Sequence, residues 1–130
     1  MRADDAVQAV NHGARALVVS NHGGRQLDGA VTALDVLPRV VDAVAGRSEV
    51  LVDGGVRRAI DVLKALALGA RAVMIGRPVA WGLAVAGEDG VRHVFDLLRT
   101  DLLRDLMLCG YASPAEVDRS LVVPALATSP

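Results

Sequence analysis

Two hydrophobic patterns alternate along this chain, one typical of strands and the other of helices. Unbroken apolar runs, rich in β-branched residues, occur at 16–19, 50–52 and 72–75. Each run ends in polar residues or glycine. Such runs are typical of strands that are buried on both faces, the usual arrangement in parallel sheets. We therefore predict three strands that are buried on both faces.

Between these runs, apolar residues recur at spacings of three and four, which predicts helices. Thr32 is placed to cap one of them, because its side-chain oxygen can accept a hydrogen bond from a free backbone amide. Gly46 is placed to end the same helix, since glycine adopts the left-handed conformation at little cost. The first three helices are predicted at 4–12, 32–45 and about 60–68.

A short segment around Trp81, whose indole we assign to packing, precedes a long helix predicted from about Gly90 to Cys109. Ser113–Glu116 has the pattern of a capping box and predicts one last short helix. The residues from 121 to 130 show no periodicity. The apolar stripe of the long helix consists of Val91, Phe95, Leu98, Leu102 and Leu106.

This alternation of helices and strands predicts a parallel sheet with right-handed crossover connections. Three strands do not close such a fold by themselves. A (β/α)8 barrel needs eight strand–helix units and about 250 residues. The 130 residues therefore predict part of a larger architecture.

Composition excludes several classes of function. The chain has 14 Lys and Arg, 15 Asp and Glu, a net charge of -1 and only three aromatic residues, a poor match to a nucleic-acid surface. No apolar run approaches the roughly 20 residues that cross a bilayer. The N-terminus lacks the apolar stretch of a signal peptide, so we expect a cytoplasmic protein. Cys109 is the only cysteine, which excludes an internal disulfide; we expect it to be buried, and we expect no metal site.

The loop after the first predicted strand holds two reactive groups on a glycine-rich segment. His22 can take a proton near neutral pH, and Arg25 can bind a carboxylate through two hydrogen bonds. Together they suit an acid whose reacting carbon lies beside its carboxylate. The alternative is a polar turn in which His22 caps a helix and Arg25 is solvated.

The other two strands also end in glycine and arginine. Gly54 and Gly55 precede a helix, so backbone amides and a helix N-terminus can approach an anion there. Asp53 would repel a phosphate at close range and fits a sugar-type hydroxyl better. An ordinary tight turn is the alternative. Gly76 and Arg77 repeat the pattern after the third strand, where barrel enzymes frequently hold a phosphate.

These motifs, in this order, resemble the FMN-dependent α-hydroxy-acid dehydrogenases and oxidases, the group that includes glycolate oxidase and lactate oxidase. The resemblance implies an α/β fold that is the C-terminal part of a (β/α)8 barrel, with about three parallel strands and their flanking helices. Residues 1–120 would form this partial barrel, and 121–130 an irregular tail. The matching segments are Ser20–Asp28, Asp53–Arg58, Lys64–Ala70 and Ile75–Pro78.

The resemblance also implies a role for each site residue. His22 would be the base that removes a proton from a small 2-hydroxy acid while a hydride equivalent reaches FMN, and Arg25 would hold the substrate carboxylate. Ser20 would lie near the flavin and Asp53 would meet the ribityl hydroxyls. The cofactor-binding residues that it implies are Ser20, Asp53, Gly54, Gly55, Val56, Arg57, Gly76 and Arg77, and the FMN phosphate falls to Gly55, Arg57, Gly76 and Arg77.

The family's substrate-contacting tyrosine, the aspartate that orients the histidine and the lysine near the flavin belong to earlier strands, which have no counterpart here. An alternative hypothesis is therefore a catalytically silent half-barrel or relic, which binds at most phosphate, FMN or a partner chain. A weaker alternative is another FMN or nucleotide-phosphate barrel that shares only the last two loops. Unpaired sheet edges also predict association, for example as a homo-oligomer. We expect no nucleic-acid or membrane partner.

Overall fold

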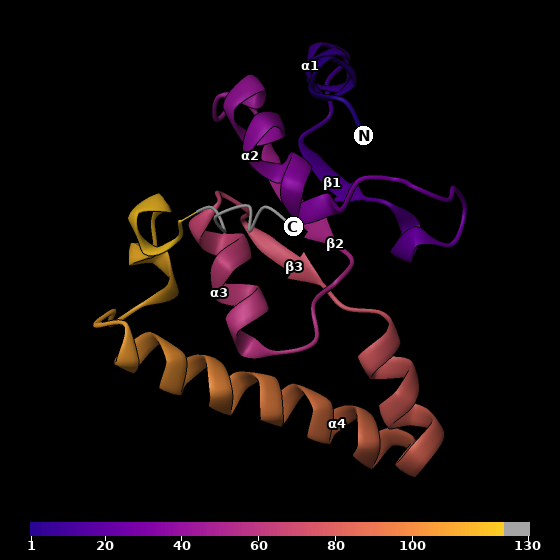
Figure 1. Cartoon of the computed structure of the whole chain (residues 1–130), viewed down its shortest axis with the longest axis vertical. Helices are drawn as coiled ribbons and strands as arrows, with labels where there is room; N and C mark the ends of the chain where they lie inside the picture. The colour runs from indigo at the N-terminus through magenta and orange to yellow at the C-terminus, as the bar shows by residue number, and fades with distance from the viewer. Residues whose placement is uncertain (124–130) are drawn as a thin grey trace, which may run out of the picture.

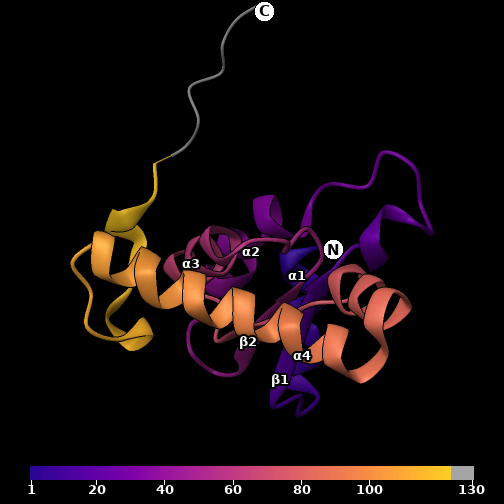
Figure 2. The same cartoon turned by 90° about the horizontal axis from the view of Figure 1, so that it is seen from below.

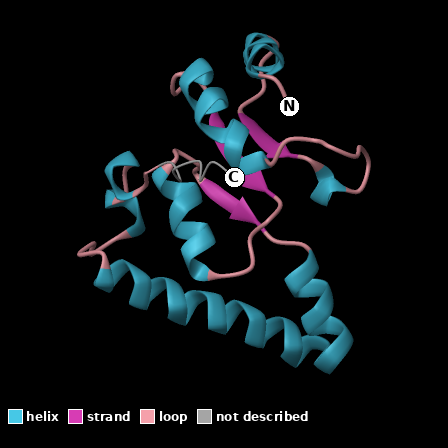
Figure 3. Cartoon of the chain, viewed as in Figure 1, coloured by secondary structure: helices cyan, strands magenta, loops and turns pink. Residues whose placement is uncertain are grey.

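A computed structural model of the chain describes residues 1–123, and it contains one three-stranded sheet with helices around it (Figures 1 and 3). The predicted alternation of helices and strands is confirmed. The elements are α1 (Ala3–Asn11), β1 (Ala16–Ser20), η1 (His22–Gly24), α2 (Ala33–Val44), β2 (Glu49–Asp53), α3 (Ala59–Ala67), β3 (Ala72–Met74), α4 (Arg77–Leu108), η2 (Pro114–Glu116) and η3 (Arg119–Leu121), where η marks a single-turn 3-10 helix.

The strands are parallel and lie in the order β1-β2-β3. The register pairs Ser20 with Asp53, and Asp53 with Met74. Since the carboxyl ends of all three parallel strands lie at the same end of the sheet, the loops that follow them converge there.

The core lies between one face of this sheet and helix α2. Val19, Val50 and Val52 point to that face and are buried. Leu37 of α2, which packs in the same cluster, is completely buried. As predicted, α2 starts at a Thr32 cap, whose Oγ1 accepts a hydrogen bond from the Asp35 amide. It ends where Ala45 and Gly46 adopt positive φ, and Pro38 lies inside it without interrupting it.

The opposite face of the sheet is open in the described residues, so the prediction of strands buried on both faces is wrong for β1 and β3. Val18 is 51% exposed and Met74 is 47% exposed. The register places both on the face that carries Ser20 and Asp53, because side chains alternate along a strand. The helices cover only the other face, and an unbroken apolar run does not reveal that a cover is missing.

Helix α4 begins earlier than predicted, at Arg77, so Trp81 belongs to a helix rather than to a connecting segment. Ala86 and Gly87 have non-helical backbone angles and divide α4 into two parts. The parts cross at two glycines: a Cβ added to Gly82 would lie 2.6 Å from the carbonyl oxygen of Gly90. Figure 2 shows the longer part running alongside α3, against which α4 packs.

Three expectations for this region are wrong. Trp81 is 54% exposed, Phe95 of the predicted stripe is 52% exposed, and Cys109 is exposed. Leu106 of the stripe is buried as expected. The reason is that α4 contacts α3 along only one narrow side, so that most of the apolar surface of α4 finds no neighbour among residues 1–123.

The segment after α4 forms η2 and η3, so the short helix predicted at Ser113 is a single 3-10 turn capped by the Ser113 hydroxyl. Of the predicted irregular tail, Leu121 ends η3, and residues 124–130 lie outside the described part. None of the described helices combines the length and the hydrophobicity that a membrane span needs.

Candidate functional site

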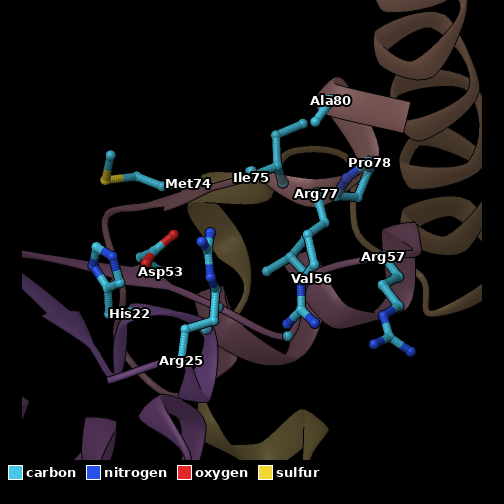
Figure 4. Close-up of a pocket in the computed structure, with 14 residues that line it drawn as sticks. His22, Arg25, Asp53, Val56, Arg57, Met74, Ile75, Arg77, Pro78 and Ala80 are labelled. Carbon is cyan, nitrogen blue, oxygen red and sulfur yellow. The ribbon is translucent and has the colours of Figure 1, made fainter. Parts of the chain in front are cut away.

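The three loops that follow the strands enclose a cleft of about 410 Å³ (Figure 4). The structure brings every predicted site residue except Ser20 to the wall of this cleft, and Ser20 lies directly behind it, bonded to Asp53. The lining residues are His22, Gly23, Arg25, Asp53, Gly54, Gly55, Val56, Arg57, Met74, Ile75, Gly76, Arg77, Pro78 and Ala80.

Ser20 links the first two loops. Its hydroxyl donates a hydrogen bond of 2.5 Å to Oδ2 of Asp53, and it accepts one of 3.0 Å from the backbone amide of His22. The sheet register makes this possible, because it places Ser20 and Asp53 side by side on the open face. The carboxylate at the end of β2 is therefore connected to the backbone of the histidine that follows β1.

The first loop turns sharply at His22. This residue has φ 56°, in the left-handed region that non-glycine residues rarely adopt, and Gly23 and Gly24 continue the turn with positive φ. The Gly24 amide closes the turn on the carbonyl of Asn21 at 3.0 Å. Figure 4 shows the Arg25 side chain extending upward from this loop on the same side of the cleft as His22 and Asp53.

The second loop presents backbone amides to the cleft. Gly54 and Gly55 have φ of 103° and 82°, values that favour glycine. Asp61 of α3 accepts hydrogen bonds from the amides of Arg57 and Arg58 at 3.0 and 2.9 Å. The amide of Gly55 has no protein acceptor among residues 1–123, and a Cβ added to this glycine would meet nothing within 4 Å.

The third loop begins helix α4 at the cleft. The amides of Gly76 and Arg77 likewise have no acceptor in the described part of the chain, as is usual in the first turn of a helix. The Arg77 side chain crosses the cleft toward the first loop, where its Nη2 lies 3.7 Å from a Cβ built on Gly23. Arg57 lies farther from the first loop than Arg77 does, at the opposite end of the cleft from His22 (Figure 4).

The charges in the cleft favour an anion. Arg25, Arg57 and Arg77 line it together with a single carboxylate, Asp53. Oxygen Oδ2 of that carboxylate is occupied by Ser20, which leaves Oδ1 free to accept from a ligand hydroxyl. Among the described residues, no group of three or more His, Cys, Asp or Glu side chains is arranged to hold a metal ion. The arrangement can therefore bind a phosphate at its glycine end, hydroxyls at Asp53 and a carboxylate near Arg25.

Comparison with known proteins identifies the fold family. The sequence profile described as FMN-dependent dehydrogenase matches residues 1–124. This chain belongs to that family. It is 57% identical over 122 residues to the L-lactate oxidase of a Nostoc species and 52% identical over 122 residues to human 2-hydroxyacid oxidase 1. Each match covers 94% of this chain and 33% of the relative.

Solved structures agree with the sequence relatives. A mandelate oxidase bound to benzoyl-formic acid superimposes with a TM-score of 0.89 at 53% identity, over 92% of this chain and 36% of that one. The prediction of a partial (β/α)8 barrel in the FMN-dependent family is thus confirmed. The chain spans about a third of the length of the relatives it matches.

The residues of the cleft fit FMN, the cofactor of this family. The amides of Gly55, Gly76 and Arg77 have no acceptor within residues 1–123, and neither glycine has a side chain in the way, so the three amides suit a phosphate. The carboxylate of Asp53 would repel a phosphate, but Asp53 lies near His22, at the end of the cleft away from Arg57 (Figure 4). A hydroxyl-bearing chain of the cofactor could pass beside Asp53 at that end.

Some residues that shape the cleft were not predicted as site residues. Met74, Ile75, Pro78 and Ala80 line it, and the sign of the first two in the sequence is their place in the third apolar run, directly before Gly76. Asp61 orders the second loop through the two arginine amides, and an acidic residue in the first turn of a helix is the sequence signal that could have indicated this helix start.

Proposed function

We propose that the chain supplies the base, the carboxylate-binding cation and the phosphate-binding loops of an enzyme that oxidises a small 2-hydroxy acid to the 2-oxo acid with FMN. The observation that supports this most directly is the shared cleft. His22 and Arg25 line the same cavity as Gly55 and Gly76, so a substrate and a phosphate-bearing cofactor can lie side by side.

Each group has a separate task. The guanidinium of Arg25 binds the substrate carboxylate and fixes the neighbouring carbon beside His22. A neutral ring nitrogen of His22 then accepts the hydroxyl proton of the substrate, and the hydrogen on the neighbouring carbon leaves with both bonding electrons as a hydride equivalent. FMN, when bound, supplies the acceptor for the two electrons. The substrate class is supported by the names of the relatives, which are oxidases of lactate, mandelate and other 2-hydroxy acids.

The phosphate and the ribityl chain would be held by different groups of the second and third loops. Amides of Gly55 and Gly76, together with the cations Arg57 and Arg77, neutralise the phosphate. Asp53 accepts a hydrogen bond from a ribityl hydroxyl through the oxygen that Ser20 leaves free.

The test is a graft of this chain into a related barrel. The matched 122 residues replace their counterpart in the Nostoc L-lactate oxidase, and anaerobic reduction of the bound flavin by L-lactate is followed by its visible absorbance. His22→Ala should slow reduction by about 100- to 10,000-fold, the range for loss of a general base, while FMN stays bound.

His12→Ala is the matched control. His12 is an exposed histidine at the end of α1, where its Nδ1 contacts the carbonyl of Gln8, and the variant should reduce flavin at the parent rate. Unchanged reduction in His22→Ala would remove the proposed role of this residue.

The second candidate is a silent half-barrel that binds phosphate, FMN or a partner chain without turnover. The open face of the sheet favours it, since Val18 and Met74 are half exposed beside the cleft. Within the described residues no further strand pairs with the outer edges of β1 and β3, which supports association through the sheet. The test is to mix the purified 130-residue chain with FMN and L-lactate. Flavin reduction by a monomer would exclude this candidate, and binding of FMN without its reduction would support it.

A further inference from the structure

We infer that Ser20 and Asp53 act together as positioning residues for His22, by fixing the backbone turn from which the imidazole projects. This inference rests on the proposed function, because it gives His22 the role of base. It adds a task to the two residues beyond cofactor contact. The main support for it is a continuous series of hydrogen bonds that links the Asp53 carboxylate, the Ser20 hydroxyl and the His22 amide.

The turn at His22 needs such a support. A non-glycine residue at φ 56° is strained, because its Cβ crowds the backbone in the left-handed region. If φ returned to the ordinary negative range, the Cα–Cβ bond would point in another direction and the imidazole would leave the cleft. The 3.0 Å bond from the His22 amide to Ser20 Oγ fixes the peptide unit that leads into His22. The 3.0 Å bond from the Gly24 amide to the Asn21 carbonyl closes the turn after it. The two bonds together hold the backbone on both sides of the strained residue.

Asp53 determines which way the Ser20 hydroxyl points. A hydroxyl has one proton, and its bond of 2.5 Å to the carboxylate uses that proton. The lone pairs of Oγ are then left for the His22 amide. Because an ionised acceptor makes a stronger bond than a neutral one, Asp53 holds this orientation better than a carbonyl or water would.

The alternative is that Ser20 and Asp53 serve only the cofactor. In that case removal of the hydroxyl would lower FMN affinity, and the protein that still holds FMN would react at the parent rate. In the positioning role FMN stays bound, binding of a substrate carboxylate is unchanged, and only proton transfer at His22 slows. The two cases therefore separate by measurement.

The experiment uses the grafted barrel described above and compares Ser20→Ala with Ser20→Thr. Ser20→Ala should slow the limiting rate of flavin reduction by about 10- to 100-fold, the loss that follows when one hydrogen bond of a catalytic assembly is removed. The dissociation constant of propionate, which has the carboxylate but no hydroxyl for His22, should change by less than about twofold. The solvent deuterium isotope effect on the limiting rate of flavin reduction should increase, because the hydroxyl proton that His22 accepts exchanges with D2O and its transfer becomes the slower step.

Ser20→Thr restores the hydroxyl at the same position and should recover most of the rate. Asp53→Asn is the second variant. It keeps the shape of the side chain but removes its charge, so we expect flavin reduction to slow less than in Ser20→Ala, again with unchanged propionate binding. Ser48→Ala is the matched control. Its hydroxyl bonds to the carbonyl of Ala14 at the opposite end of the same strands, and reduction should proceed at the parent rate.

Two outcomes would overturn the inference: equal slowing in Ser20→Ala and Ser20→Thr, or a parent rate in the FMN-bound fraction of Ser20→Ala. Both differ from failure of the proposed function, which would show as unchanged reduction in His22→Ala.

Discussion

Helices α2 and α4 belong to the same small fold, but they are buried to very different degrees. Five of the 12 residues of α2 are buried, whereas Leu106 is the only buried residue among the 32 of α4. The buried residues of α2 are Ala33, Val36, Leu37, Val40 and Val44.

The helix that stabilises the sheet is therefore not the helix that carries part of the candidate site. Helix α2 packs on the sheet and buries five residues in the core cluster, so it contributes directly to the hydrophobic stabilisation of the strands. Helix α4 packs mainly on α3, yet its first turn carries Gly76 and Arg77 into the cleft. The phosphate end of the site is thus attached to the less buried part of the molecule, where local opening requires less free energy.

The largest effect is expected from the core. Leu37→Ala leaves a cavity between α2 and the sheet, and it should lower the free energy of unfolding of the chain by about 2–5 kcal/mol. Urea unfolding followed by circular dichroism measures it. Leu103→Ala, at a position of α4 that is 53% exposed, is the control and should cost under about 1 kcal/mol. Equal losses would contradict the contrast between the two helices.

The second largest effect is expected where the two parts of α4 cross. A Cβ on Gly90 would collide with the carbonyl of Gly82, so Gly90→Ala should force the two parts of α4 apart and lower stability by about 1–3 kcal/mol. Thermal unfolding measures the loss. Thr100→Ala, an exposed position later in the same helix, should change stability little. A stability gain in Gly90→Ala, as alanine gives in an ordinary helix, would show that the crossing is loose.

The start of α2 gives a smaller change. Thr32→Ala removes the oxygen that caps the Asp35 amide, and a loss of about 1 kcal/mol in urea unfolding is expected. Thr32→Ser retains the oxygen and should restore stability. If both variants lose the same amount, the methyl group of Thr32 matters rather than the cap.

The smallest effect concerns the surface link between α2 and η3. Arg119 Nη2 donates a 2.6 Å hydrogen bond to Asp42, and this bond raises the pKa of Arg119 above its usual value. Both side chains are largely exposed, so Asp42→Asn should cost under about 1 kcal/mol, and less still in 1 M salt. Asp96→Asn, an exposed carboxylate outside the ion pairs found in residues 1–123, is the control; a salt-independent loss specific to Asp42 would point to packing instead.

Several features of the fold followed from the pattern of the sequence. The parallel direction of the strands followed from the alternation of elements along the chain. The Thr32 cap and the end of α2 just before Gly46 depend on neighbouring residues, which the sequence displays directly. The exposure of Val18, Phe95 and Cys109 did not follow, because burial depends on what covers a side chain. An apolar residue looks the same in a sequence whether or not a neighbouring element covers it.

The site shows the same division. The glycines, His22 and the arginines were predicted from the strand ends, because loops at the carboxyl edge of a parallel sheet converge. Their catalytic and cofactor-binding roles stay predictions. The hydrogen bond between Ser20 and Asp53 was not predicted, since it joins residues 33 positions apart and depends on the register of two strands.

The sequence by itself determined the alternation of elements, the glycine-rich turns and the family, because these depend on local spacing and on residue identity. Only the tertiary structure decided that Ser20 lies against Asp53, that Arg77 reaches the first loop, and that no element within residues 1–123 covers one face of the sheet. The physical reason is that register and packing are properties of pairs of distant elements, and each is settled only when the whole sheet and its helices are assembled.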